Sequence, residues 1–493
     1  MALVKINAKD GSPVEFNYTA PKQGGQKDVY FSPDRSYVVC FYRDPLDSTD
    51  ESRIGKIVDL YRKNIFDQPG GNFWKDYFCW PEKIVEYDGM KGITAPAYQS
   101  HFFFGKSTSR AGAEKEGKWF AAPKVFNRFV PDEEKGTLLG YLQICLKLAR
   151  AAGRLHAAGL AHSDLSYKNC LVDPVGGNAC IIDIDTLVVP GVFPPQVLGT
   201  PDFIAPEVVT TQHLPFGDPQ RNVPRIETDR HALSVLIYQY LFHRHPLRGP
   251  KVHSPDRDEQ ERLEMGEKAL FIEHPTNKEN RPQKFDANDN DRQPWINPAK
   301  LPYTLCGPHL KELFDKAFID GLHDPMRRPT AAIWESALIK TLDMIQPCEN
   351  TSCVKKWFVF DDTTQPRCPY CGTLYTKVLP ILDFYAPHGG ATNFRPANRR
   401  LMVWSGQSLS LWHADRNFAP GALLTDEQRK RVGYFQFHNG KWLFVNERLP
   451  AMKNITTKQP IPIGESVELT EGLQLHLSPT MTGHLVHVRI VNG

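Results

Sequence analysis

The sequence predicts an α+β chain made of three consecutive parts. Residues 12–345 combine strand-like alternation with long amphipathic helices. Residues 346–378 hold four of the ten cysteines, in two close pairs. From residue 380 to residue 493, short apolar runs alternate with Gly and Asn turns, as at 401–403, 409–411 and 434–437, which is typical of a β sandwich. A length of 493 residues suits three domains, at about 150 residues each.

The first part begins with strands and ends with helices. Alternating apolar residues predict strands at 14–18, 29–31 and 37–42, and again near 84–87 and 93–98. Helical spacing predicts helices over 50–66, over 136–158, from Asp229 onward and over 309–345, the last broken at Asp324-Pro325. Residues 105–118 and 250–300 are polar with little periodicity, so we expect a surface loop and a surface insert there.

The charge balance indicates neither nucleic acid nor a membrane surface as a partner. Lys and Arg number 59 and Asp and Glu 56, which gives a net charge of +3. The first residues are charged and lack an apolar core, so we expect no signal peptide. No apolar run approaches the roughly 18–20 residues of a membrane helix. These observations predict a cytoplasmic chain.

The most informative segment runs from 155 to 187. A helix ends at Gly159, a short loop presents His162, Asp164 and Asn169, and the second strand of a hairpin ends at Asp183. Phosphoryl transfer needs a carboxylate that takes the proton of the acceptor hydroxyl, and oxygen ligands that hold Mg²⁺ against the phosphates. A single Asp of this kind is more often a turn residue, but the ordered set favours a phosphoryl-transfer site.

This segment resembles the catalytic loop and metal-binding strand of the protein kinase superfamily, with HSD for the usual HRD and DID for the usual DFG. The resemblance implies a two-lobed fold, with an N-lobe at about 12–104 and a C-lobe at about 119–345. It further implies that ATP is the phosphoryl donor and Asp164 the catalytic base. Asn169 and Asp183 would bind Mg²⁺, and Lys168 would contact the transferred group.

Two further motifs match the same superfamily. GTPDFIAPEVV, which contains Glu207, resembles the end of an activation segment, and DPMRRPT resembles the late arginine motif. The resemblance implies a buried ion pair between Glu207 and Arg328. It also implies that Asp229 anchors the catalytic loop, although an ordinary helix N-cap is the alternative for that residue.

The N-terminal part departs from the superfamily. Only Gly24 and Gly25 stand where a glycine-rich loop should cover the phosphates, and a plain hairpin turn is an alternative. The strand that should carry a phosphate-binding lysine has Cys40 in that position, on the same face as Val38. A neutral thiol cannot pair with phosphate, so the site needs another cation.

Three lysines are candidates for that cation. Lys56, on the next helix, is the first candidate, and a solvated helix charge is its alternative; Lys22 and Lys27 in the glycine hairpin are the others. Asp59 or Glu51 would be the acid that superfamily members carry on this helix.

The activation segment offers few hydroxyl groups. Thr186 and Thr200 are the only ones between Asp183 and Glu207. Thr200 lies in Gly-Thr-Pro, where Ser/Thr kinases place a residue that contacts the catalytic Asp. HSD also lacks the arginine that pairs with a phosphorylated loop. We therefore expect Ser/Thr specificity without ordering of the loop by phosphorylation.

Two cysteine pairs, Cys348-x4-Cys353 and Cys368-x2-Cys371, predict a structural zinc site in 346–378. Disulfides or free thiols are the alternative. The stretch after residue 380 loosely resembles a forkhead-associated domain, but the arginine and serine that bind phosphothreonine in that family have no match here. We therefore expect this module to recognise a protein without phosphate, and an unrelated β sandwich is the alternative.

Three hypotheses for function follow. The first is a Ser/Thr protein kinase similar to bacterial kinases of tellurite-resistance loci. That resemblance implies a protein substrate, with a von Willebrand A-type protein and a metal-dependent phosphatase as partners. The second is a pseudokinase scaffold, motivated by Cys40. The third is a small-molecule phosphotransferase, which the activation-segment and late arginine motifs speak against.

Overall fold

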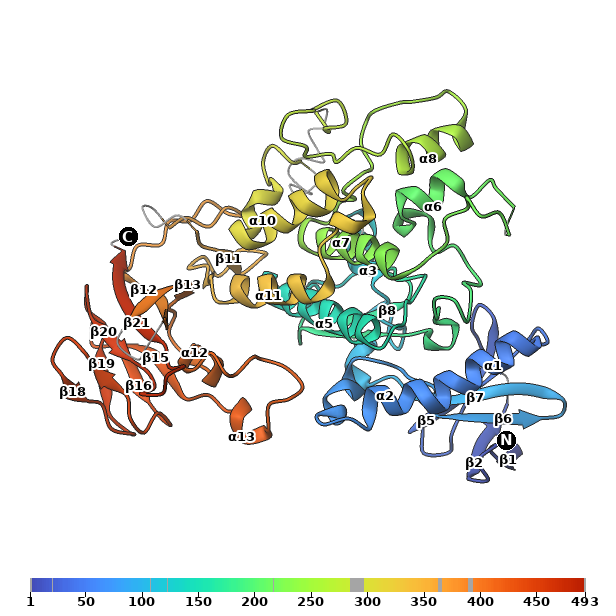
Figure 1. Ribbon diagram of the computed structural model, residues 1–493, viewed down its shortest axis with the longest axis horizontal. Coiled ribbons are helices and arrows are strands. Elements are labelled where there is room, and N and C mark those ends of the chain that lie inside the picture. The colour runs from blue at the N-terminus through green and yellow to red at the C-terminus, as the bar shows by residue number, and fades with distance from the viewer. Residues whose placement is uncertain are drawn as a thin grey trace. The chain divides into compact units, whose positions relative to one another are not determined.

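The computed structural model describes residues 2–19, 21–106, 108–121, 123–215, 217–283, 297–361, 366–388 and 393–491 (Figure 1). The chain mixes helix and strand, which confirms the predicted α+β class. It divides into two compact units. Unit 1 comprises Met1–Gly136, Gly140–Tyr303 and Lys311–Glu335, and unit 2 comprises Thr137–Leu139, Thr304–Leu310 and Ser336–Gly493.

Unit 1 begins with a hairpin and a five-stranded antiparallel sheet. The hairpin is β1 (Ala2–Asn7) and β2 (Pro13–Tyr18). The sheet, in spatial order, is β3 (Lys22–Gln23), β4 (Lys27–Phe31), β5 (Tyr37–Tyr42), β7 (Met90–Pro96) and β6 (Lys83–Tyr87). Strands therefore form where apolar alternation predicts them.

The two faces of this sheet bury different partners. On one face Phe41 packs against Phe16 of the hairpin, with ring centroids 5.6 Å apart. On the other face Cys40 packs against Ile54 of α1 (Ser48–Lys56). Successive residues of a strand point to opposite faces, so β5 presents Phe41 to the hairpin and Cys40 to the helix. After α1 the chain continues through a π-helical turn at Ile57–Tyr61 into α2 (Arg62–Phe66).

Helices make up most of the rest of unit 1. The helix α7 (Ile226–Phe242) is buried along nearly its whole circumference, as expected of a core helix. The long α5 (Leu138–Ala157) precedes the short hairpin of β8 (Cys170–Asp173) and β9 (Asn178–Ile181). The other helices of unit 1 are α3 (Lys118–Ala121), α4 (Pro123–Phe129), α6 (Pro206–Thr211) and α8 (Arg257–Met265). Two more, α10 (Pro308–Asp315) and α11 (Ala331–Leu342), each contribute residues to both units.

Unit 2 contains two antiparallel sheets that share one core. The six-stranded sheet, in order, is β13 (Phe394–Met402), β12 (Leu379–Pro387), β21 (Leu485–Val491), β20 (Gln474–His476), β17 (Lys453–Asn454) and β18 (Gln459–Pro460). The four-stranded sheet is β14 (Ser408–Leu409), β15 (Gly433–His438), β16 (Lys441–Asn446) and β19 (Ser466–Glu468). Phe384 and Val486 of the first sheet bury against Phe435 and Phe444 of the second.

Smaller elements complete unit 2. The hairpin of β10 (Ile345–Pro347) and β11 (Trp357–Val359) precedes the sheets, and α13 (Asp426–Arg429) lies between β14 and β15. The strand predicted at 409–411 is wrong in its second half, because β14 ends at Leu409 and α12 (Leu411–Ala414) begins at once. The backbone N–H of Ser410 donates to Nδ1 of His413 at 2.9 Å, which caps the new helix.

The polar insert predicted at 250–300 contains a helix. Asp256 accepts a hydrogen bond from the backbone N–H of Glu259 at 2.8 Å and so caps α8. Residues 284–296 of the insert lie outside the described residues. In the described part of the chain, no helix has the length and apolar character that crossing a membrane requires.

Candidate active site

The loop between α5 and β8 is held by Asp229 in the first turn of α7. The buried Asp229 carboxylate accepts hydrogen bonds from the backbone N–H of His162 at 2.7 Å and of Ser163 at 3.1 Å. Ser163 has a φ of 64°, which is uncommon for a residue other than glycine. Asp229 therefore fixes a loop conformation that the backbone does not favour by itself.

Asp164 is bound on both carboxylate oxygens. Oδ1 accepts from the backbone N–H of Thr200 at 2.7 Å and from its hydroxyl at 2.8 Å. Oδ2 accepts from the Asn169 amide Nδ2 at 2.9 Å. Asn169 uses its nitrogen for this bond, which leaves the amide oxygen, a hard ligand suited to Mg²⁺. The contact between Thr200 and Asp164 is the one that the Gly-Thr-Pro motif implies.

Two bonds bring Asp183 beside this loop. A His162 ring nitrogen donates to the carbonyl of Ile182 at 2.9 Å, and the Ile182 N–H donates to the carbonyl of Asn169 at 3.0 Å. Asp183 follows directly, with a φ of 62° and a half-exposed side chain. The left-handed backbone turns its carboxylate out of the strand direction. The three predicted oxygen-bearing residues, Asp164, Asn169 and Asp183, are thus brought to one place.

A buried ion pair lies against Asp183. Lys27 Nζ contacts both carboxylate oxygens of Asp185 at 2.7 Å and Oδ1 of Asp183 at 3.3 Å. The hydroxyl of Tyr42 donates to Asp185 at 2.5 Å. Burial by itself lowers the pKa of Lys27, but the charges of Asp185 and Asp183 outweigh it and raise that pKa above its usual value. Burial likewise raises the pKa of Asp185, and Lys27 overcomes this and holds it below its usual value.

The strand register explains why Lys27 takes this position. Lys27 of β4 pairs with Tyr42 of β5, and Val29 pairs with Cys40. Residues two apart on a strand share a face, so Lys27 lies diagonally next to Cys40 and on the same face as Val38. Burial raises the pKa of the Cys40 thiol to about 12, so the thiol is neutral at pH 7. The cation missing from β5 is present one strand away.

The other two candidate lysines lie elsewhere. Lys56 Nζ is 5.5 Å from the centroid of the Phe193 ring and makes no ion pair with the described residues. Lys22 pairs with Glu114. Among the three candidates, the structure places Lys27, and not Lys56, against Asp183.

The helix α1 brings no acid to the cation. Glu51 of α1 pairs with Lys91, and Asp59 of the following π-helical turn pairs with Lys63 of α2 at 2.5 Å. The buried charged residue of α1 is Arg53, which donates to the carbonyl of Pro194 at 2.6 Å. The acids predicted on this helix therefore do not contact Lys27, and Asp185 does so instead.

The glycine hairpin is tied to β5. The N–H of Gly24 donates to the carbonyl of Lys27 at 2.9 Å, and Gly25 follows in the turn. Arg43 donates to the carbonyl of Gly24 at 2.9 Å, so the end of β5 holds the turn in place. Lys168 is exposed and has no ion-pair partner among the described residues.

A buried ion pair braces the helical part of unit 1. Two nitrogens of Arg328 donate to the two oxygens of Glu207, at 2.8 and 2.7 Å. Arg328 also donates to the carbonyls of Gly321, Leu322 and Glu227, and it is 2% exposed. This fork-on-fork geometry is the pairing that the late arginine motif implies.

The four predicted cysteine ligands form one cluster in unit 2. The sulfurs of Cys348, Cys353, Cys368 and Cys371, hereafter the four-cysteine cluster, all lie within 4.8 Å of one another. Cys348 and Cys371 are 3.4 Å apart and Cys353 and Cys368 are 3.8 Å apart. A tetrahedron with metal–sulfur bonds of about 2.3 Å has sulfur–sulfur edges of about 3.8 Å. The donor set and its spacing therefore fit a tetrahedral metal ion.

Sequence patterns missed two members of the candidate site. Nothing in the sequence separates Asp185 from an exposed loop acid, and Tyr42 reads as an ordinary strand residue. Lys27 was one of three candidates. The pairing of β4 with β5 sets Lys27 opposite Tyr42, so knowledge of this register would have identified Lys27 and Tyr42.

No protein-family model matches the chain, and no curated protein matches it in sequence.

Proposed function

We propose that the chain is an ATP-dependent Ser/Thr protein kinase with a two-lobed catalytic fold. In this proposal the five-stranded sheet with α1 is the N-lobe, and the helices from α5 onward form the C-lobe. One observation carries the proposal: Asp164 and Asn169 are hydrogen-bonded to each other, and the backbone next to Asp183 is bonded to the same loop. This is the minimum set for phosphoryl transfer.

The residues take separate roles. Asp164 orients the acceptor hydroxyl and receives its proton, while the hydroxyl oxygen forms the new bond to the γ-phosphorus and ADP leaves. Asn169 and Asp183 supply oxygen ligands for Mg²⁺. Bound Mg·ATP supplies the phosphoryl group and neutralises part of its charge. Lys168, exposed near the loop, is available to the transferred group.

Lys27 is the proposed phosphate-binding cation. Its side chain is 14% exposed. Asp185 binds the ammonium group, and the Tyr42 hydroxyl in turn donates to Asp185. A held ammonium costs little reorganisation when phosphate arrives. Its contact with Asp183 at 3.3 Å is longer than its contacts with Asp185 at 2.7 Å, so Asp183 is the partner it can release to a metal.

Specificity for Ser and Thr is inferred from Thr200. Its hydroxyl is bonded to Asp164 at 2.8 Å and to the Ser166 hydroxyl at 3.1 Å, which closes one side of the base. The substrates are proposed to be proteins. By the resemblance to kinases of tellurite-resistance loci, a von Willebrand A-type protein and a metal-dependent phosphatase are the proposed partners.

The four-cysteine cluster is proposed to hold a structural Zn²⁺. Buried neighbours of Cys353 and Cys368, among them Phe358 and Tyr375, form a small core around it. A segment of this size gains its stability from the metal. The module after residue 380 is proposed to recognise a protein, as its loose forkhead-associated resemblance suggests.

A pseudokinase scaffold is the second candidate function. Cys40 replaces the usual lysine, and Lys27 is engaged by both Asp183 and Asp185. If Lys27 never releases Asp183, the chain binds nucleotide but does not transfer its phosphoryl group.

One experiment separates these functions. The purified chain is incubated with Mg²⁺, γ-labelled ATP and casein as a generic acceptor, beside Asp164→Asn, Asp183→Asn, Lys27→Ala and Lys56→Ala. We expect transfer to fall by about 100-fold or more in the first three variants and to stay unchanged in Lys56→Ala. ATP binding without transfer in the unaltered chain favours the scaffold. Absence of both binding and transfer would refute both functions.

A further inference from the structure

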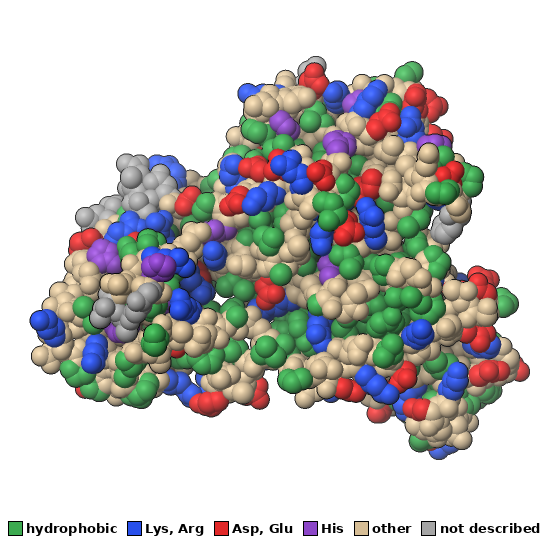
Figure 2. Space-filling model, in the orientation of Figure 1, with side chains coloured by type: hydrophobic (Ala, Val, Ile, Leu, Met, Phe, Trp, Pro, Cys, Tyr) green, Lys and Arg blue, Asp and Glu red, His purple; other side chains and the backbone are tan. Residues whose placement is uncertain are grey.

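A separate cavity opens on unit 2. Lys, Arg and His side chains gather over the surface formed by β12, β13 and β21 (Figure 2). Residues of these three strands line a cavity of about 480 Å³. Ligand pockets in proteins measure about 300–1,000 Å³, so this cavity has the size for a small ligand. All of its lining residues belong to unit 2, and none is among the residues proposed for phosphoryl transfer.

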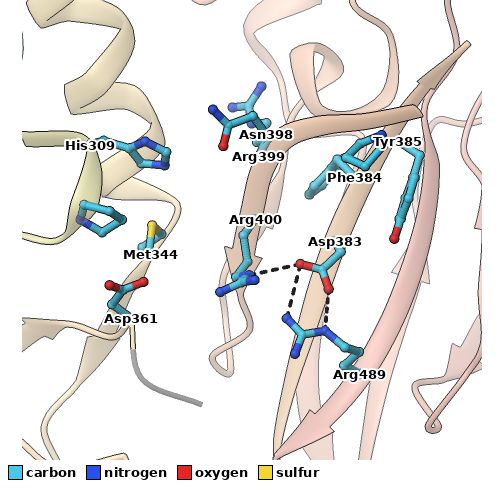
Figure 3. Close-up of a pocket in the computed structure, with 12 residues that line it drawn as sticks. His309, Met344, Asp361, Asp383, Phe384, Tyr385, Asn398, Arg399, Arg400 and Arg489 are labelled. Carbon is cyan, nitrogen blue, oxygen red and sulfur yellow. Dashed lines mark hydrogen bonds and ion pairs between the residues drawn. The ribbon is translucent and has the colours of Figure 1, made fainter. Parts of the chain in front are cut away.

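Two guanidinium groups meet at one carboxylate in this cavity (Figure 3). Arg400 Nε donates to Asp383 at 3.0 Å, and Arg489 contacts both oxygens of the same carboxylate. Burial raises the pKa of Asp383, but the two guanidiniums outweigh it and hold the pKa below its usual range. Two positive charges on one negative charge leave this three-residue cluster with a net positive charge. The terminal nitrogens of Arg400 make no hydrogen bond within the described residues, and they face the cavity.

A third guanidinium, that of Arg399, also lines the cavity. Arg399 donates to Asp343 at 2.8 Å and to the carbonyl of Trp412 at 3.2 Å. The pairing of β12 with β13 is irregular here, because Asp383 pairs with Arg400 and Tyr385 with Pro396. A bulge of this kind redirects side chains, and it lets the sequence neighbours Arg399 and Arg400 line the same cavity.

The bulge contains a second unusual feature. Asn398, also in the cavity wall, has a φ of 49°. Asn tolerates this left-handed conformation better than most residues do, and such positions gather at ligand sites. The left-handed residue Asn398 and the three arginines therefore line the same cavity.

Several apolar side chains line the rest of the cavity wall, together with His309. Phe384 and Tyr385 stand on the sheet side, and Met344 lies on the opposite side (Figure 3). Asp361 on that opposite side is the only other carboxylate that lines the cavity within the described residues. A ligand that fits must present an anion to the sheet and an apolar group to the wall.

We propose that this cavity binds a phosphate monoester carried on a flat apolar group, with the phosphate at Arg400 and Arg489 and the apolar group against Tyr385 and Met344. A phosphate offers three oxygens, enough to reach the two terminal nitrogens of Arg400 and Nη1 of Arg489, which Asp383 does not use. Asp383 positions both guanidiniums before the ligand arrives and so reduces the cost of ordering them. The site does not depend on the proposed kinase activity.

The test uses phenyl phosphate, which carries both chemical features and is not a nucleotide. Its binding to the full chain is measured by isothermal titration calorimetry. We expect Arg400→Gln and Arg489→Gln each to weaken binding about tenfold or more, because each removes charge-assisted hydrogen bonds. Arg400→Lys keeps the charge but loses the fork, and we expect an intermediate loss.

Arg395→Gln is the matched control. Arg395 is an exposed residue of the same strand that does not line the cavity, so its loss should leave the affinity unchanged. Near-ultraviolet circular dichroism of each variant verifies that unit 2 remains folded. The proposal is overturned if phenyl phosphate does not bind at millimolar concentration, or if Arg395→Gln weakens it as much as Arg400→Gln does.

Two further probes identify the source of the phosphate. A phosphotyrosine hexapeptide stands for a modified protein, and AMP stands for a free metabolite. AMP binding counts only where Arg400→Gln weakens it, because a nucleotide has a second proposed site in unit 1. Sensitivity of either probe to Arg400→Gln supports the site and names its source, and insensitivity of both probes and of phenyl phosphate refutes it.

Discussion

Replacing Lys27 with Met is expected to destabilise unit 1 by about 3–5 kcal/mol, because it leaves the buried Asp185 carboxylate without its cation. At 2.7 Å and an effective dielectric of about 20, the Coulomb attraction is about 6 kcal/mol. Relief of the desolvation of Lys27 offsets part of that loss. Asp185→Asn should cost less, about 2–3 kcal/mol, because Lys27 keeps Asp183 at 3.3 Å.

The double variant Lys27→Met/Asp185→Asn isolates the interaction. It removes both charges, so its destabilisation should fall short of the sum of the two single losses by at least about 1.5 kcal/mol. Lys22→Met is the control. Its pair with Glu114 is exposed, with 51% of the Lys22 side chain accessible, and should contribute at most about 1 kcal/mol.

Urea unfolding of the full chain gives the overall stabilities. Hydrogen exchange of peptides from β4 and β5 localises the effect, because a chain with two units need not unfold in one step. Additivity of the two single losses within about 0.5 kcal/mol would falsify the idea that Lys27 and Asp185 stabilise the fold as a pair.

The pH dependence of the same variants follows from the directions of the pKa shifts. The folded-state pKa of Asp185 is lowered, so its contribution is full above the unfolded value of about 3.9 and is lost as pH falls through the folded value. The pKa of Lys27 is raised, so its contribution is full below about 10.4 and is lost as pH rises through the folded value. In Lys27→Met, burial raises the pKa of Asp185 without an opposing cation, so the stability difference from the unaltered chain should be full from neutral pH to about pH 9 and should shrink at lower pH, where Asp185 takes up a proton in the variant.

Three further outcomes are expected. Thr186→Ala should leave casein phosphorylation unchanged, because its hydroxyl contacts only the Asp183 carbonyl, whereas Thr200→Ala should lower it by about tenfold through the lost hydrogen bond to Asp164. Glu207→Gln should lower the unfolding free energy by about 3–5 kcal/mol, because Arg328 is left buried and unpaired, and a calorimetric melting point unchanged from that of the unaltered chain would contradict this. Elemental analysis should find one zinc per chain, and its removal by a chelator should increase hydrogen exchange around the four-cysteine cluster; full chelation without faster exchange would show that the metal does not stabilise this segment.

Local sequence patterns located the parts of the site whose geometry is local. The four cysteines lie in two short pairs, so their spacing restricts where the sulfurs can point. Asp164 and Asn169 are five residues apart in one loop, and their hydrogen bond joins atoms that the chain keeps close. The alternation of β5 likewise placed Cys40 on the inner face of its sheet.

The identity of the cation beside Cys40 depends on strand register, which no local sequence pattern contains. Lys22 and Lys27 lie in the glycine hairpin and Lys56 on the next helix, and only the register of β4 on β5 decides which one lies beside Cys40. Asp185 was missed because a buried acid looks like an exposed one until its partner is known. The strand at 409–411 was half wrong because a short apolar run fits a strand and a helix equally well.

The β1–β2 hairpin has a practical consequence for work with shortened forms of the protein. Phe16 is fully buried and its ring contacts those of Tyr30, Phe41 and Tyr87. Deleting the first eighteen residues would uncover these aromatic rings on the back of the strands that carry Lys27 and Cys40. A truncated protein is therefore expected to self-associate, and its loss of phosphoryl transfer would report on the missing cover rather than on the chemistry.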